Sequence, residues 1–335
     1  MPLFSHNLGV DLGTERVRVA ENGQTLLDEP TLVVVAVEER KIVAVGEEAE
    51  QMYGRVPETL EVIRPLQHGV VAYYEVTERL LAHLFRKAGS SWLFRPRVMM
   101  TVPYGATSVE HRAVQEAALQ AGSREVYLIP TPLAAAIGAD LPIGTPSGNM
   151  LVTLGAGATQ AAVISMHGIV AAETLRLGGL DLDEAIIQYV RRKYGLIIGQ
   201  PTAERVKLEI GAAVPLDEEL ALELQGQHQV TGLPQTFTLT TSEVVEALQD
   251  PLGDILEMVR GVIEKTPPEL VSEIIDRGIA LAGGTALLRG LDRLMTKELG
   301  VPAYLVDDPL NCAAIGAARA LDILPVVRRS LVGAV

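Results

Sequence analysis

The sequence predicts an α/β fold built from two duplicated lobes. The chain has 335 residues, of which 48% are hydrophobic, and this exceeds what a single core usually organises. Its amino-terminal part has the pattern of a strand meander followed by alternating helices and strands. A similar order of elements starts again near Met150, and such a repeat indicates a duplicated lobe.

The first half is predicted to contain a meander, a helix and then alternating strands and helices. Residues 7–37 alternate in hydrophobicity and contain β-branched residues and Gly turns, which predicts the meander. Residues 75–87 place Leu80, Leu81 and Leu84 on one helical stripe. The remaining elements are a strand at 97–103, a helix with Ser108 as N-cap and Gly122 past its end, a strand at 125–130 and a helix at 131–141 with Pro132 in its first turn.

The second half repeats this order with one larger insertion. Apolar runs with β-branched residues predict its strands, and apolar residues at helical spacing predict its helices. In chain order we expect strands at 150–155 and 161–179, helices at 183–195 and 202–213, strands at 220–227 and 236–240, helices within 242–265, a strand at 278–283, a helix at 285–300, a strand at 302–306 and a helix at 311–322.

Composition excludes several classes of function. A net charge of -14 argues against binding to nucleic acid, because a phosphate backbone requires a concentrated basic surface. The single cysteine, Cys312, excludes an internal disulfide and a cysteine-rich metal site. With no charged and then apolar leader ahead of Gly9, we expect a cytoplasmic protein. The longest apolar runs last about seven residues, against roughly 18 for a membrane span, so any membrane contact is expected to be peripheral.

Three Gly-containing turns follow predicted strands: DLGT at 11–14, LGAGAT at 154–159 and LAGGTALL at 281–288. Glycine lets backbone N–H groups approach an anion closely, and Thr14 and Thr159 offer hydroxyl donors. In the third turn two glycines precede a predicted helix, whose amino end favours negative charge. Each turn alone has an ordinary structural interpretation, but their recurrence in a duplicated frame favours phosphate binding. No GxxxxGK[ST] loop is present, and no GxGxxG opens a helix after the first strand.

These turns and their surroundings resemble the MreB family of rod shape-determining bacterial actin homologues, within the superfamily of actin, sugar kinases and heat-shock chaperone ATPases. The resemblance covers essentially the whole chain. The stretches on which it rests are GVDLGTERVRV, IRPLQHGVVAYYEVTERLL, PRVMMTVPYGAT, REVYLIPTPLAAAIGADLP, LRLGGLDLDEAIIQYVRRKYG, TAERVKLEIGAA, LAGGTALLRGLDRLM and DDPLNCAAIGAARAL.

The resemblance implies an actin-like ATPase fold, in which two ribonuclease H-like lobes form four subdomains around a nucleotide cleft. The first lobe would span 1–142 with an insertion at about 33–64, and the second would span 143–335 with an insertion at about 181–250. It also implies ATP and Mg²⁺ as cofactors and double filaments of the chain itself. Such filaments would lie on the inner face of the cell membrane and organise cell-wall synthesis together with the elongation machinery.

Carried over residue by residue, the resemblance assigns a nucleotide site. Asp11 would lie on the metal and water side of the phosphates and hold Mg²⁺ through water. Without the resemblance, Glu204 and Lys207 would read as an ordinary solvated pair on a helix. The residues expected to bind the nucleotide are Gly13, Thr14, Glu15, Arg16, Gly155, Ala156, Gly157, Ala158, Thr159, Glu204, Arg205, Val206, Lys207, Gly283, Gly284, Thr285, Ala286 and Leu287.

The chain departs from the family at the positions expected to support hydrolysis. Where the family reads Asp-Ile-Gly-Gly-Gly-Thr-Thr-Glu, this chain reads TLGAGATQ, so Thr153 replaces an acid and Gln160 another, and Ala156 and Ala158 replace Gly and Thr. Thr131 stands in place of the Glu that would align the attacking water. Because threonine is no general base at neutral pH, we expect nucleotide binding with slow or absent ATPase activity. The alternative is that hydrolysis proceeds through other groups.

A basic and apolar segment at 85–98 contains Trp92, Leu93 and Phe94 in succession. An isolated apolar triplet would read as a loop folded onto the core. Here four cations surround it and suit anionic headgroups, and members of the family use a hydrophobic loop at this place to enter the bilayer. These cations are Arg86, Lys87, Arg95 and Arg97.

Two classes of function remain open at this stage. The first is a membrane-associated filament, either the principal shape filament or a degenerate paralogue that modulates one. The second is an ATP-dependent small-molecule kinase or another ATPase of the same fold. An enzyme of that kind would need a catalytic carboxylate in the cleft, and Thr131 and Thr153 argue against it.

Overall fold

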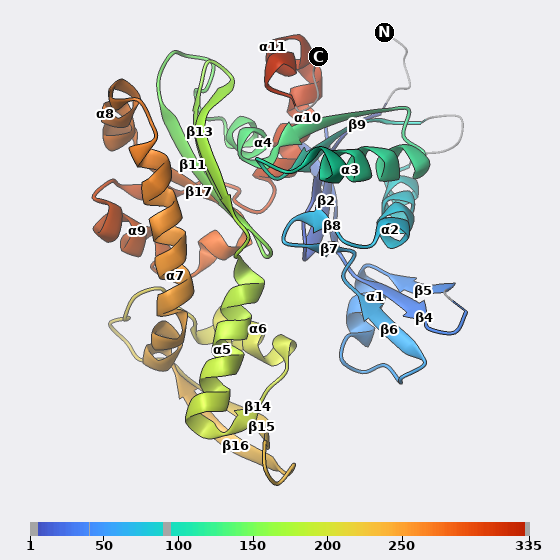
Figure 1. Cartoon of the computed structure of the whole chain (residues 1–335), viewed down its shortest axis with the longest axis vertical. Helices are drawn as coiled ribbons and strands as arrows, with labels where there is room; N and C mark the ends of the chain where they lie inside the picture. The colour runs from blue at the N-terminus through green and yellow to red at the C-terminus, as the bar shows by residue number, and fades with distance from the viewer. Residues whose placement is uncertain (1–5, 40, 90–94, 332–335) are drawn as a thin grey trace.

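The computed structural model describes residues 6–39, 41–89 and 95–331. Its first large sheet has the strand order β10-β9-β1-β2-β3, with an antiparallel meander on one side of β1 and parallel strands on the other (Figure 1). These strands are β1 (Asn7–Leu12), β2 (Arg16–Glu21), β3 (Gln24–Pro30), β9 (Arg97–Val102) and β10 (Glu125–Pro130).

The second large sheet repeats this topology in the order β13-β12-β11-β17-β18. The duplicated α/β fold predicted from the sequence is therefore confirmed, although residues 161–179 form two strands around a turn at Met166 and His167, both with positive φ. The strands are β11 (Asn149–Leu154), β12 (Thr159–Ser165), β13 (Gly168–Leu175), β17 (Ile279–Ala282) and β18 (Ala303–Leu305).

Helices cover both large sheets (Figure 1). None of the helices in the described part of the chain is long and apolar enough to cross a bilayer. The helices of the two halves are α2 (Tyr74–Lys87), α3 (Ser108–Gln120), α4 (Thr131–Gly138), α5 (Gly179–Tyr194), α6 (Gln200–Ile210), α7 (Thr241–Glu264), α8 (Pro268–Arg277), α9 (Leu291–Leu299), α10 (Cys312–Asp322) and α11 (Leu324–Val327), followed by a 3₁₀ turn at Arg328–Ser330.

Two predicted helix starts were wrong. The N-cap of α3 is Thr107 and not Ser108, because Thr107 Oγ1 accepts the Glu110 N–H at 3.2 Å and the Glu110 carboxylate accepts the Thr107 N–H at 2.7 Å. The helix expected at 285–300 is split. A 3₁₀ turn covers Gly284–Leu287, and α9 begins only after Gly290, whose left-handed conformation (φ 72°) interrupts the helical pattern.

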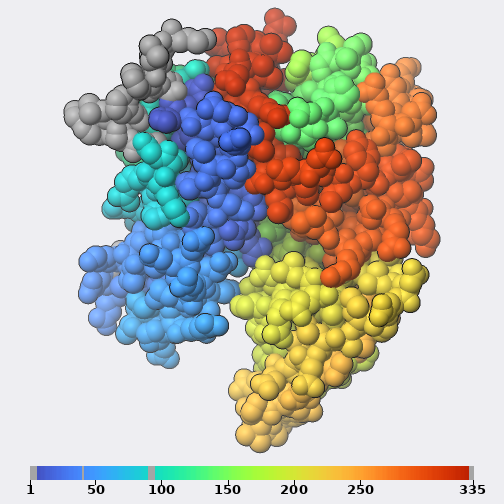
Figure 2. Space-filling view, turned by 180° about the vertical axis from the view of Figure 1, so that it is seen from behind, coloured from blue at the N-terminus to red at the C-terminus, as the bar shows by residue number. Residues whose placement is uncertain are grey.

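Two smaller sheets project at the same end of the molecule (Figures 1 and 2). The sequence did not predict α1, β5, β6, β14 or α8, and the lobe and insertion boundaries proposed above stay predictions. The first small sheet contains β4 (Val33–Ala36), β5 (Lys41–Val45) and β6 (Leu60–Ile63), with α1 (Glu47–Met52) beside it; the second contains β14 (Leu196–Ile197), β15 (Ala221–His228) and β16 (Pro234–Thr240); a short hairpin forms β7 (Leu66–Gln67) and β8 (Val70–Val71).

Helices α4 and α10 cross between the two large sheets in direct backbone contact. Helix α4 follows β10 in the chain but also packs on β11 and β12, while α10 packs on β1, β2 and β9. A Cβ atom on Gly138 would lie 1.8 Å from the Cys312 carbonyl oxygen, and one on Gly316 would lie 1.8 Å from the Ala134 carbonyl oxygen. Only glycine permits this approach, so the crossing fixes each sheet against the other.

Glu243 lies in the first turn of α7, at the centre of a hydrogen-bonded cluster in the second half. Its carboxylate accepts the Thr240 N–H at 2.8 Å and the Tyr194 hydroxyl at 2.6 Å, and lies 2.8 Å from Lys193 Nζ. Burial acts to raise the pKa of Glu243, but the hydrogen bonds from Lys193, Tyr194 and Thr240 outweigh it and lower the pKa to about 2.

We expect Glu243→Gln to lower the free energy of unfolding by about 1–2 kcal/mol at neutral pH, because it loses the charged acceptor of the cap. A carboxyl group with a lowered folded pKa stabilises the fold above its unfolded pKa and ceases to do so as the pH falls toward the folded value. The difference should therefore shrink between about pH 4.5 and 2. Urea unfolding of both proteins across this range measures it. Glu257→Gln, on an exposed position of the same helix, is the control, and a deficit that does not change with pH would refute the assignment.

Candidate functional site

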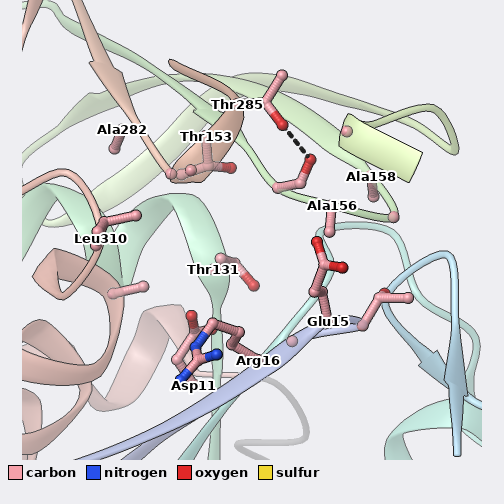
Figure 3. Close-up of a pocket in the computed structure, with 18 of the residues that line it drawn as sticks. Asp11, Glu15, Arg16, Thr131, Thr153, Ala156, Ala158, Ala282, Thr285 and Leu310 are labelled. Carbon is pink, nitrogen blue, oxygen red and sulfur yellow. Dashed lines mark hydrogen bonds between the residues drawn. The ribbon is translucent and has the colours of Figure 1, made fainter. Parts of the chain in front are cut away.

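A cleft of about 460 Å³ lies between the two large sheets, at the turns that follow β1, β11 and β17 (Figure 3). Most of the residues predicted for a nucleotide site line it together. Those predicted residues are Asp11, Gly13, Thr14, Glu15, Arg16, Thr131, Thr153, Gly155, Ala156, Gly157, Ala158, Glu204, Lys207, Gly283, Gly284, Thr285 and Leu287.

The first two Gly-containing turns face one another across this cleft. The turn at 13–15 joins β1 to β2, and the turn at 155–158 joins β11 to β12. They lie so close that a Cβ atom on Gly157 would be 2.4 Å from Thr14 Oγ1. Within the described part of the chain, the backbone N–H groups of residues 14, 15 and 156–158 donate no hydrogen bond. Two adjacent turns with unused N–H groups are suited to holding an anion between them.

The two threonine hydroxyls predicted to face the ligand differ in their roles. Thr14 Oγ1 accepts the Gly69 N–H at 2.9 Å, so its own proton remains available to a ligand. Thr159 is fully buried, and its hydroxyl donates to the Leu177 carbonyl oxygen at 2.9 Å. The expectation that Thr159 offers a donor to the cleft was wrong, because the pairing of β12 with the chain after β13 uses that proton.

The third turn is attached to the second. Gly283 has φ 92°, and a Cβ atom there would lie 2.3 Å from the Leu154 carbonyl oxygen. Thr285 Oγ1 donates to the Gly155 carbonyl oxygen at 2.9 Å (Figure 3). Ala286 is buried and does not line the cleft. Since a short 3₁₀ turn follows Gly283, the predicted helix amino terminus is absent here, and the turn contributes backbone and hydroxyl groups only.

Helices α5 and α6 form another wall of the cleft through a buried ion pair. Lys207 Nζ lies 2.7 Å from Asp183 Oδ1 and donates to the Gly179 carbonyl oxygen at 2.7 Å. Gln200 Nε2 donates to Asp183 Oδ2 at 3.2 Å. Burial raises the pKa of Glu204, and the nearby carboxylates raise it further. Lys207 is therefore held by α5 and is not part of a solvated pair with Glu204.

Sequence reasoning missed Asp183 and misplaced two residues of α6, Arg205 and Val206. Asp183 is 0% exposed, and its signal was a carboxylate beside Leu182 and near Ile186, both on the buried side of α5. Arg205 lies half-exposed near Glu209 on the outer side of α6. Val206 is fully buried in the core. The pitch of α6 thus directs Glu204 and Lys207 into the cleft and turns the two residues between them away.

Asp11 and the two threonines expected to stand in place of acids line the cleft (Figure 3). Asp11 Oδ1 accepts the Thr101 hydroxyl at 2.7 Å. Burial raises the pKa of Asp11, and the Thr101 hydrogen bond and the charge of Arg18 only partly oppose this. Thr131 Oγ1 donates to the Val102 carbonyl oxygen at 3.1 Å, and Thr153 Oγ1 lies 3.4 Å from that of Gln160. Both hydroxyls keep lone pairs for a water molecule but supply no base.

Four carboxylates line the cleft, those of Asp11, Glu15, Asp28 and Glu204. Glu15 lies 3.4 Å from Arg64, and Asp28 accepts the Arg16 Nε–H at 2.7 Å. In the described ranges no group of three or more His, Cys, Asp or Glu residues could hold a metal ion. Asp11 lines the cleft next to the turn at 13–15, and the acid that would oppose it is replaced by Thr153. Mg²⁺ prefers oxygen ligands and retains several waters, so it would enter this site bound mainly to phosphates and water.

Comparison with known proteins identifies close relatives. The family model described as MreB/Mbl protein matches residues 5–328. Cell shape-determining protein MreB of Escherichia coli K12 is 46% identical over 329 residues, which cover 96% of this chain and 95% of that protein. Cell shape-determining protein Mbl of Bacillus subtilis is 42% identical over 322 residues, covering 96% of this chain and 97% of that protein.

Solved structures of a relative superimpose closely on this chain. MreB5 of Spiroplasma citri bound to ADP superimposes with a TM-score of 0.91 at 30% identity, covering 96% of this chain and 97% of that one. The same protein bound to AMPPNP also gives a TM-score of 0.91 at 30% identity, with 97% of this chain and 98% of that one covered.

We expect Gly157→Ala to lower the midpoint of thermal unfolding, because the added methyl group would overlap the Thr14 side chain and force the facing turns apart. Overpacking of this kind costs roughly 1–3 kcal/mol. Gly253→Ala is the matched control, since a Cβ atom there meets nothing within 4 Å and its place inside α7 favours alanine. Differential scanning calorimetry measures both midpoints. Equal stability of the Gly157 variant and the parent would show that the turns separate freely.

Proposed function

This chain belongs to the MreB/Mbl family, and from that premise we propose that it is an ATP-binding, membrane-associated, actin-like filament protein that organises cell-wall synthesis and cell shape, with slow or absent hydrolysis. We propose further that it works in the cytoplasm at the inner face of the cell membrane. Its partners there are other copies of the same chain, assembled in double filaments, and the cell-wall elongation machinery.

The facing turns and the bound nucleotides of the relative support nucleotide binding. A structure at 30% identity and TM-score 0.91 contains ADP, and its counterpart contains AMPPNP. The turns at 13–15 and 155–158 line the cleft, and the N–H groups of residues 14, 15 and 156–158 are unused. In the proposal they hold the phosphates of ATP, and Asp11 contacts Mg²⁺ through water. Lys207 and Glu204 line the part of the cleft assigned to the adenosine.

The single observation that most supports slow hydrolysis is the pair of threonines in place of acids. Phosphoryl transfer to water requires a group that positions the nucleophile. At Thr131 and Thr153 the hydroxyl protons point to backbone carbonyl oxygens, so each side chain presents only a neutral acceptor to the cleft. Losing the aligning acid affects the transition state more than the ground state, which preserves binding and reduces turnover.

Association in filaments is proposed because a protein of the same fold assembles in them. MamK, solved as a double helical filament, superimposes with a TM-score of 0.80 over 94% of this chain and 98% of that one. At 24% identity this likeness shows the fold alone. The double filaments of this chain are therefore part of the proposal.

Membrane association is proposed on the sequence of residues 92–94, which lie outside the described residues. The four flanking cations attract an anionic membrane less strongly than their number indicates, because two of them are paired with carboxylates. Lys87 Nζ is paired with Glu29 Oε1, and Arg97 Nε lies 3.0 Å from Glu125 Oε2. Arg86 and Arg95 are exposed, and neither forms an ion pair within the described part of the chain. The net attraction to an anionic surface is therefore nearer to two charges than four.

For hydrolysis, we expect ATP to bind while phosphate release stays far slower than that of Escherichia coli MreB measured side by side. Thr131→Glu with Thr153→Asp should raise single-turnover hydrolysis by about 100-fold, the lower end of the range of general acid–base contributions. Quenched-flow assays with radiolabelled ATP measure the chemical step directly.

The matched control is Thr231→Glu with Thr236→Asp, which places the same changes on the exposed β15–β16 hairpin. Turnover in the parent equal to that of Escherichia coli MreB would contradict the proposal. So would a double variant that binds ATP as tightly as the parent but hydrolyses it no faster.

For membrane binding, we expect liposomes containing anionic lipid to sediment the polymerised protein, and replacement of Trp92, Leu93 and Phe94 by Ser to abolish this. Partial burial of three large apolar side chains contributes roughly 5 kcal/mol, and each unpaired cation adds about 1 kcal/mol. A monomer should bind weakly because loop ordering offsets part of this, whereas a filament gains avidity.

The salt dependence separates the contributions to membrane binding. With two of the four cations paired, added salt should weaken sedimentation only modestly. Arg86→Gln with Arg95→Gln should remove most of that dependence. If the serine variant sedimented with liposomes as well as the parent, the membrane proposal for residues 92–94 would be wrong.

A further inference from the structure

Three charged side chains form a row across the first sheet at the cleft. Asp11 on β1 is opposite Arg18 on β2, and Arg18 is opposite Asp28 on β3. Residues directly opposite one another in antiparallel strands project from the same face, with Cβ atoms about 5 Å apart. All three line the cleft together with Arg16, which lies two residues from Arg18 on the same face of β2. Sequence reasoning missed Arg18 and Asp28.

The Asp28 carboxylate in this row lies close to two guanidinium groups, those of Arg16 and Arg18. Arg16 Nε donates to Asp28 Oδ1 at 2.7 Å, and Arg16 Nη2 donates to the Asp28 carbonyl oxygen at 3.0 Å. Arg18 Nε lies 3.2 Å from Asp28 Oδ2, but its buried N–H is misaligned for a hydrogen bond. Asp28 thus engages Arg16 fully and Arg18 only through charge.

Arg18 is consequently rich in donors and poor in acceptors. Its side chain is 12% exposed, and within the described residues it donates no hydrogen bond. Of its nitrogens, Nε is buried without a hydrogen-bond partner. A guanidinium group has five N–H donors, and a buried N–H without a partner is costly. Asp11 Oδ1 accepts the Thr101 hydroxyl, and within the described residues the ion pair of Arg18 is with Asp28 and not with Asp11. The remaining donors can be satisfied by an anionic ligand in the cleft, which Arg18 lines.

On the proposed nucleotide-binding function, we infer that Arg18 binds a phosphate group of the nucleotide and supplies part of the positive charge that Mg²⁺ would otherwise provide. The planar guanidinium fork matches two phosphate oxygens and requires no dehydration of a metal ion. Arg18 also faces Asp11, so the carboxylate proposed to contact the hydrated cation is partly neutralised. Both effects act in the same direction, and nucleotide affinity depends only weakly on divalent cation.

The test is isothermal titration of the full chain with ADP, in Mg²⁺ and in excess EDTA. For the parent we expect the dissociation constants in the two conditions to differ by less than about tenfold. Arg18→Gln should weaken ADP binding roughly 10- to 100-fold in EDTA, the range that charge-assisted hydrogen bonds span. Mg²⁺ should restore much of that loss, because the cation then supplies the missing charge. Arg18→Lys should retain an intermediate affinity, since it keeps the charge without the fork.

Controls separate this role from folding. Arg124→Gln removes a cation that lies 3.3 Å from Glu125 outside the cleft, and it should leave both constants unchanged. Arg18→Gln with Asp28→Asn preserves the charge balance of the row, and it should bind ADP as weakly as the single variant if it folds with parental circular dichroism.

The outcomes distinguish this inference from the proposed function. A parent that binds ADP only with Mg²⁺, or an Arg18→Gln protein that binds as tightly as the parent in EDTA, would overturn the role of Arg18 while leaving nucleotide binding intact. A folded parent that binds ADP in neither condition would overturn the proposed function and this inference with it.

Discussion

The close crossing of α4 and α10 is the constraint on which the rest of the structure depends. Gly138 and Gly316 allow the two backbones to touch, and the surrounding alanines leave no side chain to hold them apart. Each helix packs on the sheet of the other half, so the two sheets cannot move independently of this pair. The relative position of the two sheets in turn sets the distance between the turns at 13–15 and 155–158. A site made of backbone N–H groups from both halves depends on that distance.

Most of the two large sheets could be predicted because their signals are local. Strands such as 97–103 and 150–155 are apolar runs bounded by Gly or Pro, and the repeated order reveals the duplication. The missed elements carry weaker signals. Helix α1 is six residues long and opens with three acids among its first four residues, and β14 has only two residues. The break before α9 depends on a single left-handed glycine inside an otherwise helical pattern.

The candidate site was predicted where glycine marks a turn, and was missed where side chains meet across strands or helices. The turns at 13–15 and 155–158 are visible in the sequence. Asp183 and Arg18 are not visible as site residues, because their positions depend on the packing of α5 against α6 and on the register of three strands. Thr159 was misjudged for the same reason, since its partner Leu177 lies 18 residues further along the chain.

The central claim is that this chain assembles filaments that retain ATP, because its cleft holds the phosphates but lacks an acid that aligns water. Cryo-electron microscopy of filaments grown from purified protein with ATP tests this most directly. The account predicts double filaments with density for the third phosphate between the turns at 13–15 and 155–158. Filaments that contain ADP with no third phosphate after growth in ATP would contradict the account, as would a protein that forms no filaments with any nucleotide.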